Sequence, residues 1–261
     1  MRYSFFKRLN DIKKYSSGYV CRKLQSINYL ENCVFAWHLQ HLFKKLDIQC
    51  VLDIGANIGG FKEFLRQKVG FKGSIISFEP VRQNYERLRL IKKKDYKWEV
   101  YPYALGSEPG EKDINVMKDS LFSSFLTPDD SNTSDFRALN QIHYKETVEM
   151  KTLDSILTDL KINIPKNNLY LKIDTQGYEM EVLKGAARSL ASFYGIQVEL
   201  PIIKLYKEPQ EWQDILKYVL EAGFDIAGFF PVNYDSRLRL IEVDCVMINK
   251  NYMKLAARGR L

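Results

Sequence analysis

Short apolar runs and amphipathic helical stretches alternate along most of the chain. The runs are rich in β-branched and aromatic residues, which is typical of buried strands. They lie at Cys50–Leu52, Ser74–Phe78, Trp98–Ala104, Leu169–Ile173, Gly195–Leu200, Phe224–Phe229 and Cys245–Ile248. Helical spacing of apolar residues occurs between them, at Phe61–Leu65, Val81–Ile91, Leu153–Leu160, Gly177–Leu190 and Glu211–Ala222. The alternation predicts an α/β fold with a mainly parallel sheet and helices on both of its faces.

Some segments depart from this alternation. A helical pattern over Asn28–Leu46 precedes the first strand, and we expect this helix to cap the sheet. Two more strand-like runs, Asp113–Met117 and Thr147–Lys151, flank the polar stretch Leu121–Asn140, which is the longest irregular segment. Irregular segments of this length in compact domains are often lids or binding loops.

Charge is unevenly distributed along the 261 residues. Lys and Arg number 39 against 32 Asp and Glu, and much of the excess falls near the start. We expect a basic N-terminal helical extension (1–46), one main domain (47–250) and a short basic tail (251–261). The extension is either ordinary solvated surface or a segment that attracts an anionic membrane or glycan. No nucleic-acid-binding module accompanies the charge, so no nucleic-acid partner is expected.

The sequence shows no sign of export. No apolar stretch approaches the roughly 18 residues that a membrane-spanning helix needs, and Met1–Tyr19 lacks the apolar core of a signal peptide. The four cysteines are scattered without metal-ligand spacing, which fits a reducing compartment. We expect a cytoplasmic protein, peripheral to the membrane if the basic extension binds lipid. The oligomeric state is left open.

The stretch Val51–Phe61, VLDIGANIGGF, is the most informative part of the chain. An apolar run ends in Asp53, a glycine-rich loop follows, and a helical pattern begins at Phe61. This order predicts the strand–turn–helix corner at which open α/β sheets bind nucleotides. Glycine allows positive φ and a close approach of the backbone to a ligand, although glycines in such a turn also serve packing alone.

An acidic residue ends the next strand and narrows the choice of cofactor. Glu79 is placed to accept hydrogen bonds from two ribose hydroxyls, a device that dinucleotide enzymes also use. Their fingerprint, however, requires a glycine where this chain has Asn57, to make room for a pyrophosphate. The pattern D-x-G-x-N-x-G therefore favours a cofactor with a ribose but no phosphate, such as S-adenosylmethionine. A nucleotide-dependent oxidoreductase remains the alternative.

Several motifs in order make the chain resemble the FkbM family of S-adenosylmethionine-dependent methyltransferases. They are VLDIGANIGGF (51–61), ISFEP (76–80), YALG (103–106), the V-x-M-K-T-L-D-S-I run (148–156), YLKIDTQGYEMEVLKGA (170–186), VEL (198–200) and GFFPVNYDSRLRLIEVDCVMIN (228–249). Each motif is weak alone, but the ordered set covers about residues 45 to 250. The resemblance implies a Rossmann-like class I methyltransferase fold, with a seven-stranded sheet whose last strand is antiparallel.

The resemblance also implies a cofactor site. Gly55, Asn57 and Gly59 would line the methionine part of S-adenosylmethionine, Asp53 would fix their loop, and Glu79 would hold the ribose. Ala104 and Leu105 would border the adenine. Ser123 and Ser124 would reach the cofactor carboxylate, and Asp174 would lie beside the sulfonium. The family often has Glu where this chain has Gln176. That departure weakens any role of position 176 as a base or metal ligand.

Transfer of a methyl group to a hydroxyl calls for a base, since a protonated hydroxyl is a poor nucleophile. Asp174 is the first candidate, although its carboxylate could instead offset the sulfonium charge. His143 has the most suitable intrinsic pKa, and Glu199 could orient the acceptor. Glu179, at a helix start, complements the helix dipole rather than reacting. Two separate carboxylates make no metal signature, so no metal is expected.

The functional expectation is O-methylation of a hydroxyl on a sugar, a polysaccharide or another small-molecule acceptor, with S-adenosylhomocysteine as the second product. The acceptor class rests on the resemblance alone. An N-methyltransferase of the same fold and a non-catalytic module that only binds the cofactor are the alternatives.

Overall fold

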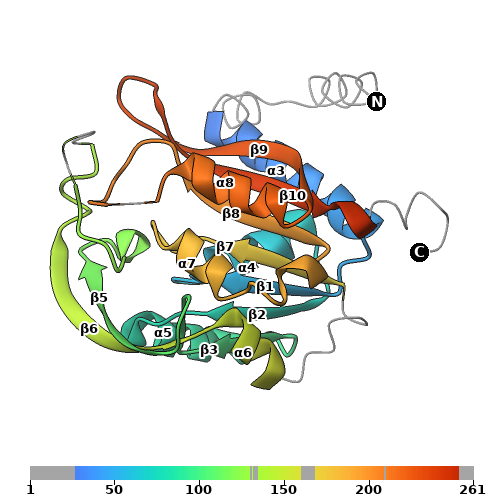
Figure 1. Cartoon of the computed structure of the whole chain (residues 1–261), viewed down its shortest axis with the longest axis horizontal. Coiled ribbons are helices and arrows are strands. Elements are labelled where there is room, and N and C mark those ends of the chain that lie inside the picture. Colours follow the sequence, from blue (N-terminus) through green and yellow to red (C-terminus); the bar gives the residue numbers. More distant parts are fainter. Residues whose placement is uncertain (1–26, 130, 132–134, 160–167, 209, 253–261) are drawn as a thin grey trace, which may run out of the picture.

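The main sheet is the seven-stranded, mostly parallel sheet that the sequence predicts. The structure is a computed structural model that describes residues 27–129, 131, 135–159, 168–208 and 210–252. Seven strands lie in the order β3-β2-β1-β7-β8-β10-β9 (Figure 1). Their bounds are β1 Cys50–Ile54, β2 Ser74–Phe78, β3 Trp98–Tyr101, β7 Leu169–Ile173, β8 Gly195–Pro201, β9 Phe224–Tyr234 and β10 Leu240–Asn249. β10 runs antiparallel to the other six strands, which confirms the predicted sheet.

Helices cover both faces of this sheet, as predicted (Figure 1). One face packs against α6 (Leu153–Asp159), α7 (Glu179–Lys184) and α8 (Trp212–Glu221). The other packs against α3 (Ile27–Lys45), α4 (Gly60–Phe64), which continues as a π-helical turn over Leu65–Val69, and α5 (Arg82–Lys92). The central strands β1 and β7 are buried at every position, which their near-continuous apolar sequences explain.

A second sheet was not predicted. Its three strands lie in the order β4-β6-β5, with β4 at Ala104–Leu105, β5 at Gly110–Met117 and β6 at Ile142–Lys151. The sequence pattern joined Trp98–Ala104 into one strand, whereas β3 ends at Tyr101. Pro102 follows and has no N–H to offer a ladder, so the chain leaves the first sheet there. The residues that follow, Ala104 and Leu105, pair with β6 instead.

Helix α7 is shorter than the predicted Gly177–Leu190. Gln176 and Gly177 have φ of 54° and 93°, which a right-handed helix does not allow, so the helix begins after them. At its other end, a Cβ on Gly185 would lie 2.0 Å from the backbone oxygen of Gly106. Gly185 is therefore required where the helix meets the second sheet. A separate 3₁₀ turn, Leu190–Ser192, follows.

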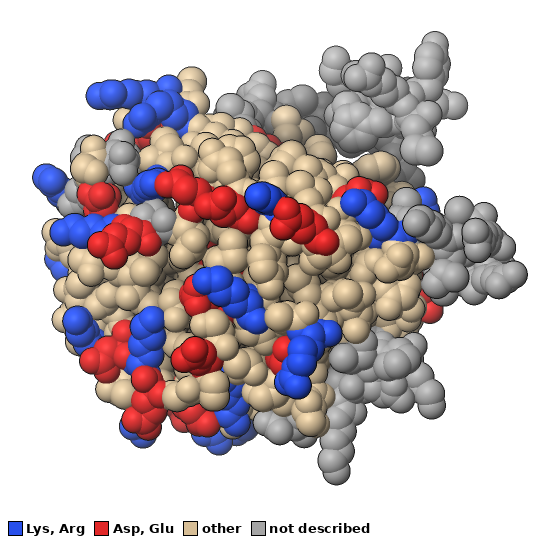
Figure 2. Space-filling view, in the orientation of Figure 1, with Lys and Arg blue, Asp and Glu red and all other residues tan. Residues whose placement is uncertain are grey.

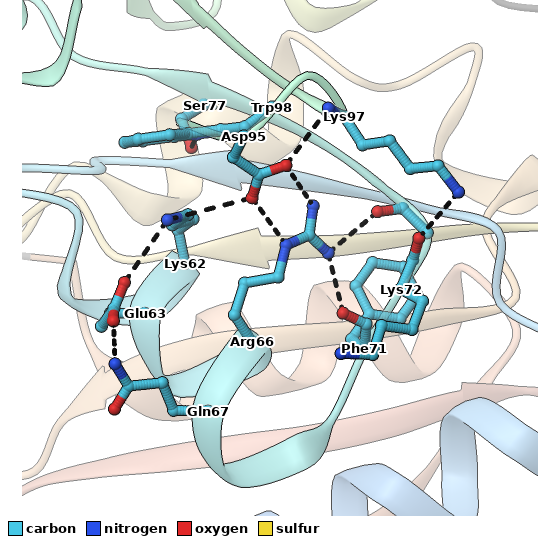
Figure 3. A network of polar contacts seen from close by, with 11 residues as sticks. Lys62, Glu63, Arg66, Gln67, Phe71, Lys72, Ser77, Asp95, Lys97 and Trp98 are labelled. Carbon is cyan, nitrogen blue, oxygen red and sulfur yellow. Dashed lines mark hydrogen bonds and ion pairs between the residues drawn. The ribbon is translucent and has the colours of Figure 1, made fainter. Parts of the chain in front are cut away.

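A polar network anchors the α4 side of the β1 loop to the far end of β3 (Figure 3). The Arg66 guanidinium forms an ion pair with Asp95, with Nε and Oδ2 2.8 Å apart. The same side chain donates to the carbonyl oxygens of Phe71 and Gly73, each at 2.9 Å. Lys62 lies 3.9 Å from Asp95 and above the Trp98 ring. These contacts fix the helix that follows the glycine-rich loop.

Helix α3 contributes to the same core as the sheet. Its side chains Phe35, Leu39 and Phe43 are buried, and they pack with Val51 and Tyr170 of the central strands. Residues 1–26 and 253–261 lie outside the described residues. The predicted domain limits and the membrane contact of the basic extension therefore stay predictions.

On the face drawn in Figure 2, acidic and basic side chains lie next to one another, so this face presents no continuous basic surface. Within the described residues, no helix is both long and apolar enough to cross a membrane.

Candidate functional site

The glycine-rich loop leaves β1 in a conformation that only small residues tolerate. Gly55 has φ 82°, and a Cβ there would lie 1.8 Å from the backbone oxygen of Asp174. Asn57 has φ 47°, which asparagine accepts more readily than most residues. Gly59, with φ 88°, is the N-cap of α4. The loop therefore passes directly over the end of β7, where Asp174 begins the next turn.

Glu79 is a buried carboxylate held by the same loop. Its Oε2 accepts a hydrogen bond from the backbone N–H of Asn57 at 2.7 Å, and its Oε1 accepts one from Val81 at 2.9 Å. Burial raises the pKa of Glu79 to about 7, although these N–H groups and Asn84 act in the opposite direction. Oε1 also accepts a longer hydrogen bond from Asn84 Nδ2 at 3.5 Å, whereas Oε2 keeps a lone pair for a further donor such as a ribose hydroxyl.

A buried lysine joins the carboxylates of β1 and β7. Lys172 Nζ lies 3.2 Å from both Asp53 and Asp174, and it donates to the carbonyl oxygen of Gly55 at 3.3 Å. The carboxylates of Asp174 and Asp53 raise the pKa of Lys172, against the effect of its burial. Asp53 also accepts a hydrogen bond from Ser77. Asp53 is thus connected to the loop through Lys172, and its role in fixing the loop stays a prediction.

Sequence reasoning missed Lys172. The signal was present, since a lysine in the middle of the apolar run Leu169–Ile173 cannot be buried without partners. The identity of those partners, however, depends on strands that are distant in the sequence.

Gln176 links the two carboxylates that were expected near the reacting group. Its Nε2 donates to Asp174 Oδ1 at 3.2 Å and to Glu199 Oε2 at 2.7 Å. Its Oε1 accepts from the Tyr206 hydroxyl at 3.0 Å. The amide that replaces the family's common glutamate is therefore the centre of the hydrogen-bond network, a role that its sequence position did not reveal.

The pKa values of Asp174 and Glu199 are shifted in opposite directions. Burial, together with the charges of Asp174 and other nearby carboxylates, raises the pKa of Glu199 well above its usual value. Burial also acts to raise the pKa of Asp174, but Lys172, Gln176 and Glu199 lower it overall. The pair therefore holds a proton on Glu199 in preference to Asp174. The two groups titrate as a coupled pair.

Two more carboxyl groups belong to this region. Burial raises the pKa of Glu242 to about 7 and that of Asp244 to about 6, and the negative charge of Asp174 adds to both effects. Both lie on β10, whose antiparallel direction brings its first residues to the carboxyl edge of the sheet.

A cavity of about 420 Å³ lies at this edge. Seven of the expected cofactor residues line it, namely Gly55, Asn57, Glu79, Ala104, Leu105, Ser123 and Asp174, and Glu199 lines it too. The Leu121–Asn140 segment contributes Phe122, Phe125 and Phe136 to its wall. This segment therefore lies against the cavity, as a binding loop would. Asp53, Gly59 and Ser124 do not line the cavity.

The two adjacent serines have different roles in the structure. Ser123 lies on the cavity wall, and its Oγ accepts a hydrogen bond from the N–H of Met117. Ser124 is fully buried, and its hydroxyl donates to the carbonyl oxygen of Gln176 at 2.6 Å. Ser124 holds the turn that carries Gln176, and its direct contact with a cofactor carboxylate stays a prediction.

His143 is not brought to the carboxylates. It lies exposed on β6 and lines a neighbouring hollow, whose lining includes neither Asp174 nor Glu199. Its catalytic role gains no support from this position.

Glu179 has a local structural role. Its Oε1 accepts hydrogen bonds from the backbone N–H of Thr175 at 2.8 Å and of Gly177 at 3.1 Å, which fixes the turn before α7.

The charge of the residues that line the cavity indicates which cofactor can bind there. Among the described residues that line it, five are acidic and none is Lys, Arg or His; the acidic residues are Glu79, Asp119, Asp174, Glu199 and Glu242. Such a lining repels phosphate and attracts a cation. S-adenosylmethionine fits, because its sulfonium and ammonium groups outweigh its one carboxylate, whereas a dinucleotide with its two phosphates does not. Over the part of the chain that the structure describes, no cluster of three or more His, Cys, Asp or Glu could hold a metal ion.

Several solved structures share part of this chain path at low sequence identity. Fibrillarin from Aeropyrum pernix with bound S-adenosyl-L-methionine matches with a TM-score of 0.41 at 9% identity, over 77% of this chain and 66% of its own. An rRNA methylase from Streptococcus thermophilus has a TM-score of 0.42 at 10% identity, over 80% and 93%. Magnesium protoporphyrin IX methyltransferase from Synechocystis PCC 6803 has 0.44 at 9%, over 90% and 86%.

No curated protein matches the sequence. A family model described as the methyltransferase FkbM domain matches residues 53–226, which include the β1 loop, Glu79, Asp174 and Glu199. The chain therefore belongs to the FkbM methyltransferase family.

Proposed function

We propose that this protein transfers the methyl group of S-adenosylmethionine to a hydroxyl oxygen of a sugar, a polysaccharide or another small acceptor. One observation carries the proposal: Glu79, Asp174 and Glu199 line a single cavity at the carboxyl edge of the sheet, and none of the other described residues that line it is basic. S-adenosylmethionine supplies an already activated methyl group, and the protein therefore mainly has to align the acceptor and exclude water.

The cofactor would extend along the strand ends. Glu79 accepts hydrogen bonds from both ribose hydroxyls, while the buried Ala104 and Leu105 border the adenine ring. Gly55 leaves room for the methionine part because it has no side chain, and the Asn57 side chain is held by hydrogen bonds from Asn84 and Ser120.

The proton of the acceptor hydroxyl passes to the Asp174–Glu199 pair. Asp174 carries the negative charge and is the group available to accept it. As the methyl group bonds to the acceptor oxygen, its bond to sulfur breaks and the sulfur keeps the electron pair. The products are a methyl ether, S-adenosylhomocysteine and a protonated carboxyl pair. The acidic lining would also bind an amine, so N-methylation is the second candidate.

The decisive experiment is calorimetric titration of the purified chain with S-adenosylmethionine, S-adenosylhomocysteine and NADH in parallel. We expect micromolar binding of the two sulfur compounds and none of NADH. Glu79→Ala should weaken that binding by ten- to a hundredfold, because two hydrogen bonds to a charged group are lost. If NADH binds and the sulfur compounds do not, the oxidoreductase alternative is favoured and the proposal fails.

Asp174→Asn separates catalysis from binding. The variant keeps the size of the side chain and should retain cofactor affinity within a few-fold, whereas transfer of tritiated methyl groups to acceptor glycosides should fall at least a hundredfold. Undiminished transfer would show that Asp174 is not the proton acceptor. Cofactor binding without transfer to any acceptor by the unmodified chain would favour the non-catalytic module.

A further inference from the structure

A second cavity lies on the α3–α4 face of the sheet, beside the proposed cofactor site. Its volume is also about 420 Å³. It shares Gly55, Asn57, Leu121, Asp174, Glu199 and Val232 with the first cavity. The two cavities therefore meet at the Asp174–Glu199 pair. In-line transfer of a methyl group requires the donor and the acceptor on opposite sides of that group, and two cavities joined at one carboxylate pair provide this arrangement.

Four phenylalanines form one wall of the second cavity, which we call the phenylalanine-lined cavity. Phe35 comes from α3, Phe61 and Phe64 from α4, and Phe230 from β9. The Phe35 ring stacks on Phe230 at 4.7 Å between centroids and on Phe64 at 5.3 Å. Aromatic side chains give this wall an apolar character, which suits the C–H face of a sugar ring.

The opposite wall is polar and contains an unsatisfied acceptor. Gln197 is 2% exposed and lines this cavity, and its Oε1 has no hydrogen-bond partner. The Gln197 amide also hydrogen-bonds the carboxylate of Asp244. A buried amide oxygen without a partner destabilises the fold, and a ligand hydroxyl that donates to it would remove this penalty.

The charged groups around this cavity favour donors and exclude anions. Glu31, Asp174, Glu199 and Asp244 line it with one cation, Lys172. That lysine is already paired with Asp53 and Asp174. A ligand that carries a carboxylate would meet uncompensated negative charge, whereas hydroxyl groups find acceptors on Gln197 and the carboxyl groups.

From these contacts we infer that the phenylalanine-lined cavity is the acceptor subsite, and that it holds a saccharide ring without negative charge, stacked on Phe230 with a hydroxyl donated to Gln197. The inference rests on the proposed function, because it places the acceptor opposite the cofactor at Asp174.

The test is saturation-transfer NMR on the chain loaded with S-adenosylhomocysteine, using methyl glucoside, methyl glucosaminide and methyl glucuronide as probes. We expect signals from the glucoside and the glucosaminide and none from the glucuronide. Phe230→Ala and Gln197→Met should each reduce the glucoside signal at least fivefold. Phe229→Ala is the matched control, since Phe229 is adjacent in β9 but 48% exposed and outside the cavity lining. It should leave the signal unchanged.

Calorimetry on the same variants distinguishes the possible failures. Affinity for S-adenosylhomocysteine should stay within twofold in Phe230→Ala and Gln197→Met. A tenfold loss of this affinity would assign the cavity to the cofactor and overturn the inference. A missing glucoside signal, binding of the glucuronide or binding of the glucosaminide alone would also overturn it. So would equal effects of Phe229→Ala and Phe230→Ala on the glucoside signal. Failure of the unmodified chain to bind S-adenosylhomocysteine would instead overturn the proposed function.

Discussion

Glu79 shows how burial changes the chemistry of one residue. Its pKa of about 7, raised by burial, means that the carboxyl group is only partly ionised at neutral pH. Contact with two ribose hydroxyls requires the ionised form, because a protonated carboxyl group loses an acceptor site.

The affinity for S-adenosylmethionine should therefore depend on pH. The ionised fraction of a group with a pKa of about 7 falls roughly tenfold between pH 8 and pH 6, so the Kd should rise by about tenfold over this range. Calorimetric titration at half-unit steps checks this expectation. The Glu79→Gln variant cannot titrate and is the control, which should bind more weakly with a flatter pH profile. Parallel profiles for the two proteins would contradict the role assigned to Glu79.

Gln176 illustrates the value of a neutral side chain among acids. Replacement by glutamate would put a third carboxyl group within about 3 Å of Asp174 and Glu199, at the distances where the amide now donates. Repulsion raises the pKa of the added group in the folded protein, so its destabilising effect appears as pH rises through that pKa.

We expect the Tm difference between the unmodified chain and Gln176→Glu to be small at pH 5.5 and to grow by several degrees by pH 8. Gln176→Met removes the hydrogen bonds without adding charge, and its deficit should be the same at both pH values. A deficit for Gln176→Glu that does not change with pH would show that the added carboxyl group escapes into solvent.

At the scale of elements, the turn from β1 into α4 requires glycine at position 55 but not at position 60. A Cβ at Gly55 would overlap the Asp174 backbone oxygen, and its positive φ adds strain. Gly60, in the first turn of α4, has open space around it.

Gly55→Ala should lower the free energy of unfolding by more than 2 kcal/mol and weaken cofactor binding, because the loop must move away from β7. Gly60→Ala should be neutral or stabilise the fold by up to about 1 kcal/mol, since alanine is the better helix former. Chemical denaturation of the two variants measures this contrast. Similar losses for both would mean that the loop is not constrained by its contact with Asp174.

The elements that the sequence predicted well are those specified by local patterns. The strand before Asp53, the loop and Glu79 follow one another within a short stretch, so apolar runs and glycines suffice to locate them. The second sheet could not be found this way, because β4 is only a two-residue strand whose partner, β6, lies far along the chain. Lys172 and Gln176 were missed for the same reason, as their partners come from separate strands.

At the scale of the whole molecule, the carboxyl cluster makes stability depend on pH. Burial raises the pKa of Glu79 and Glu242 to about 7 and of Asp244 to about 6. The folded state then holds more protons than the unfolded state between about pH 4.5 and 7. Stability from these groups is present at low pH and is lost as pH rises through their folded pKa values.

The free energy of unfolding should accordingly fall on the order of a few kcal/mol between pH 5 and pH 8. The lowered pKa of Asp174 acts in the opposite direction, but only below its ordinary range near pH 4. Urea denaturation at the two pH values measures the change, and Asp244→Asn should reduce it. Equal or greater stability at pH 8 would show that these carboxyl groups titrate normally in the folded protein.

The position of β10 has a consequence for the order of events during synthesis. β10 is made last among the strands, yet it lies between β8 and β9 and brings Glu242 and Asp244 to the site. A nascent chain that ends after β9 already has the glycine-rich loop, Glu79 and Asp174. It lacks one wall of both cavities, and β8 remains an open edge to which another chain can add. The enzyme is therefore completed in a single late step, in which the insertion of one strand both closes the sheet and finishes the site.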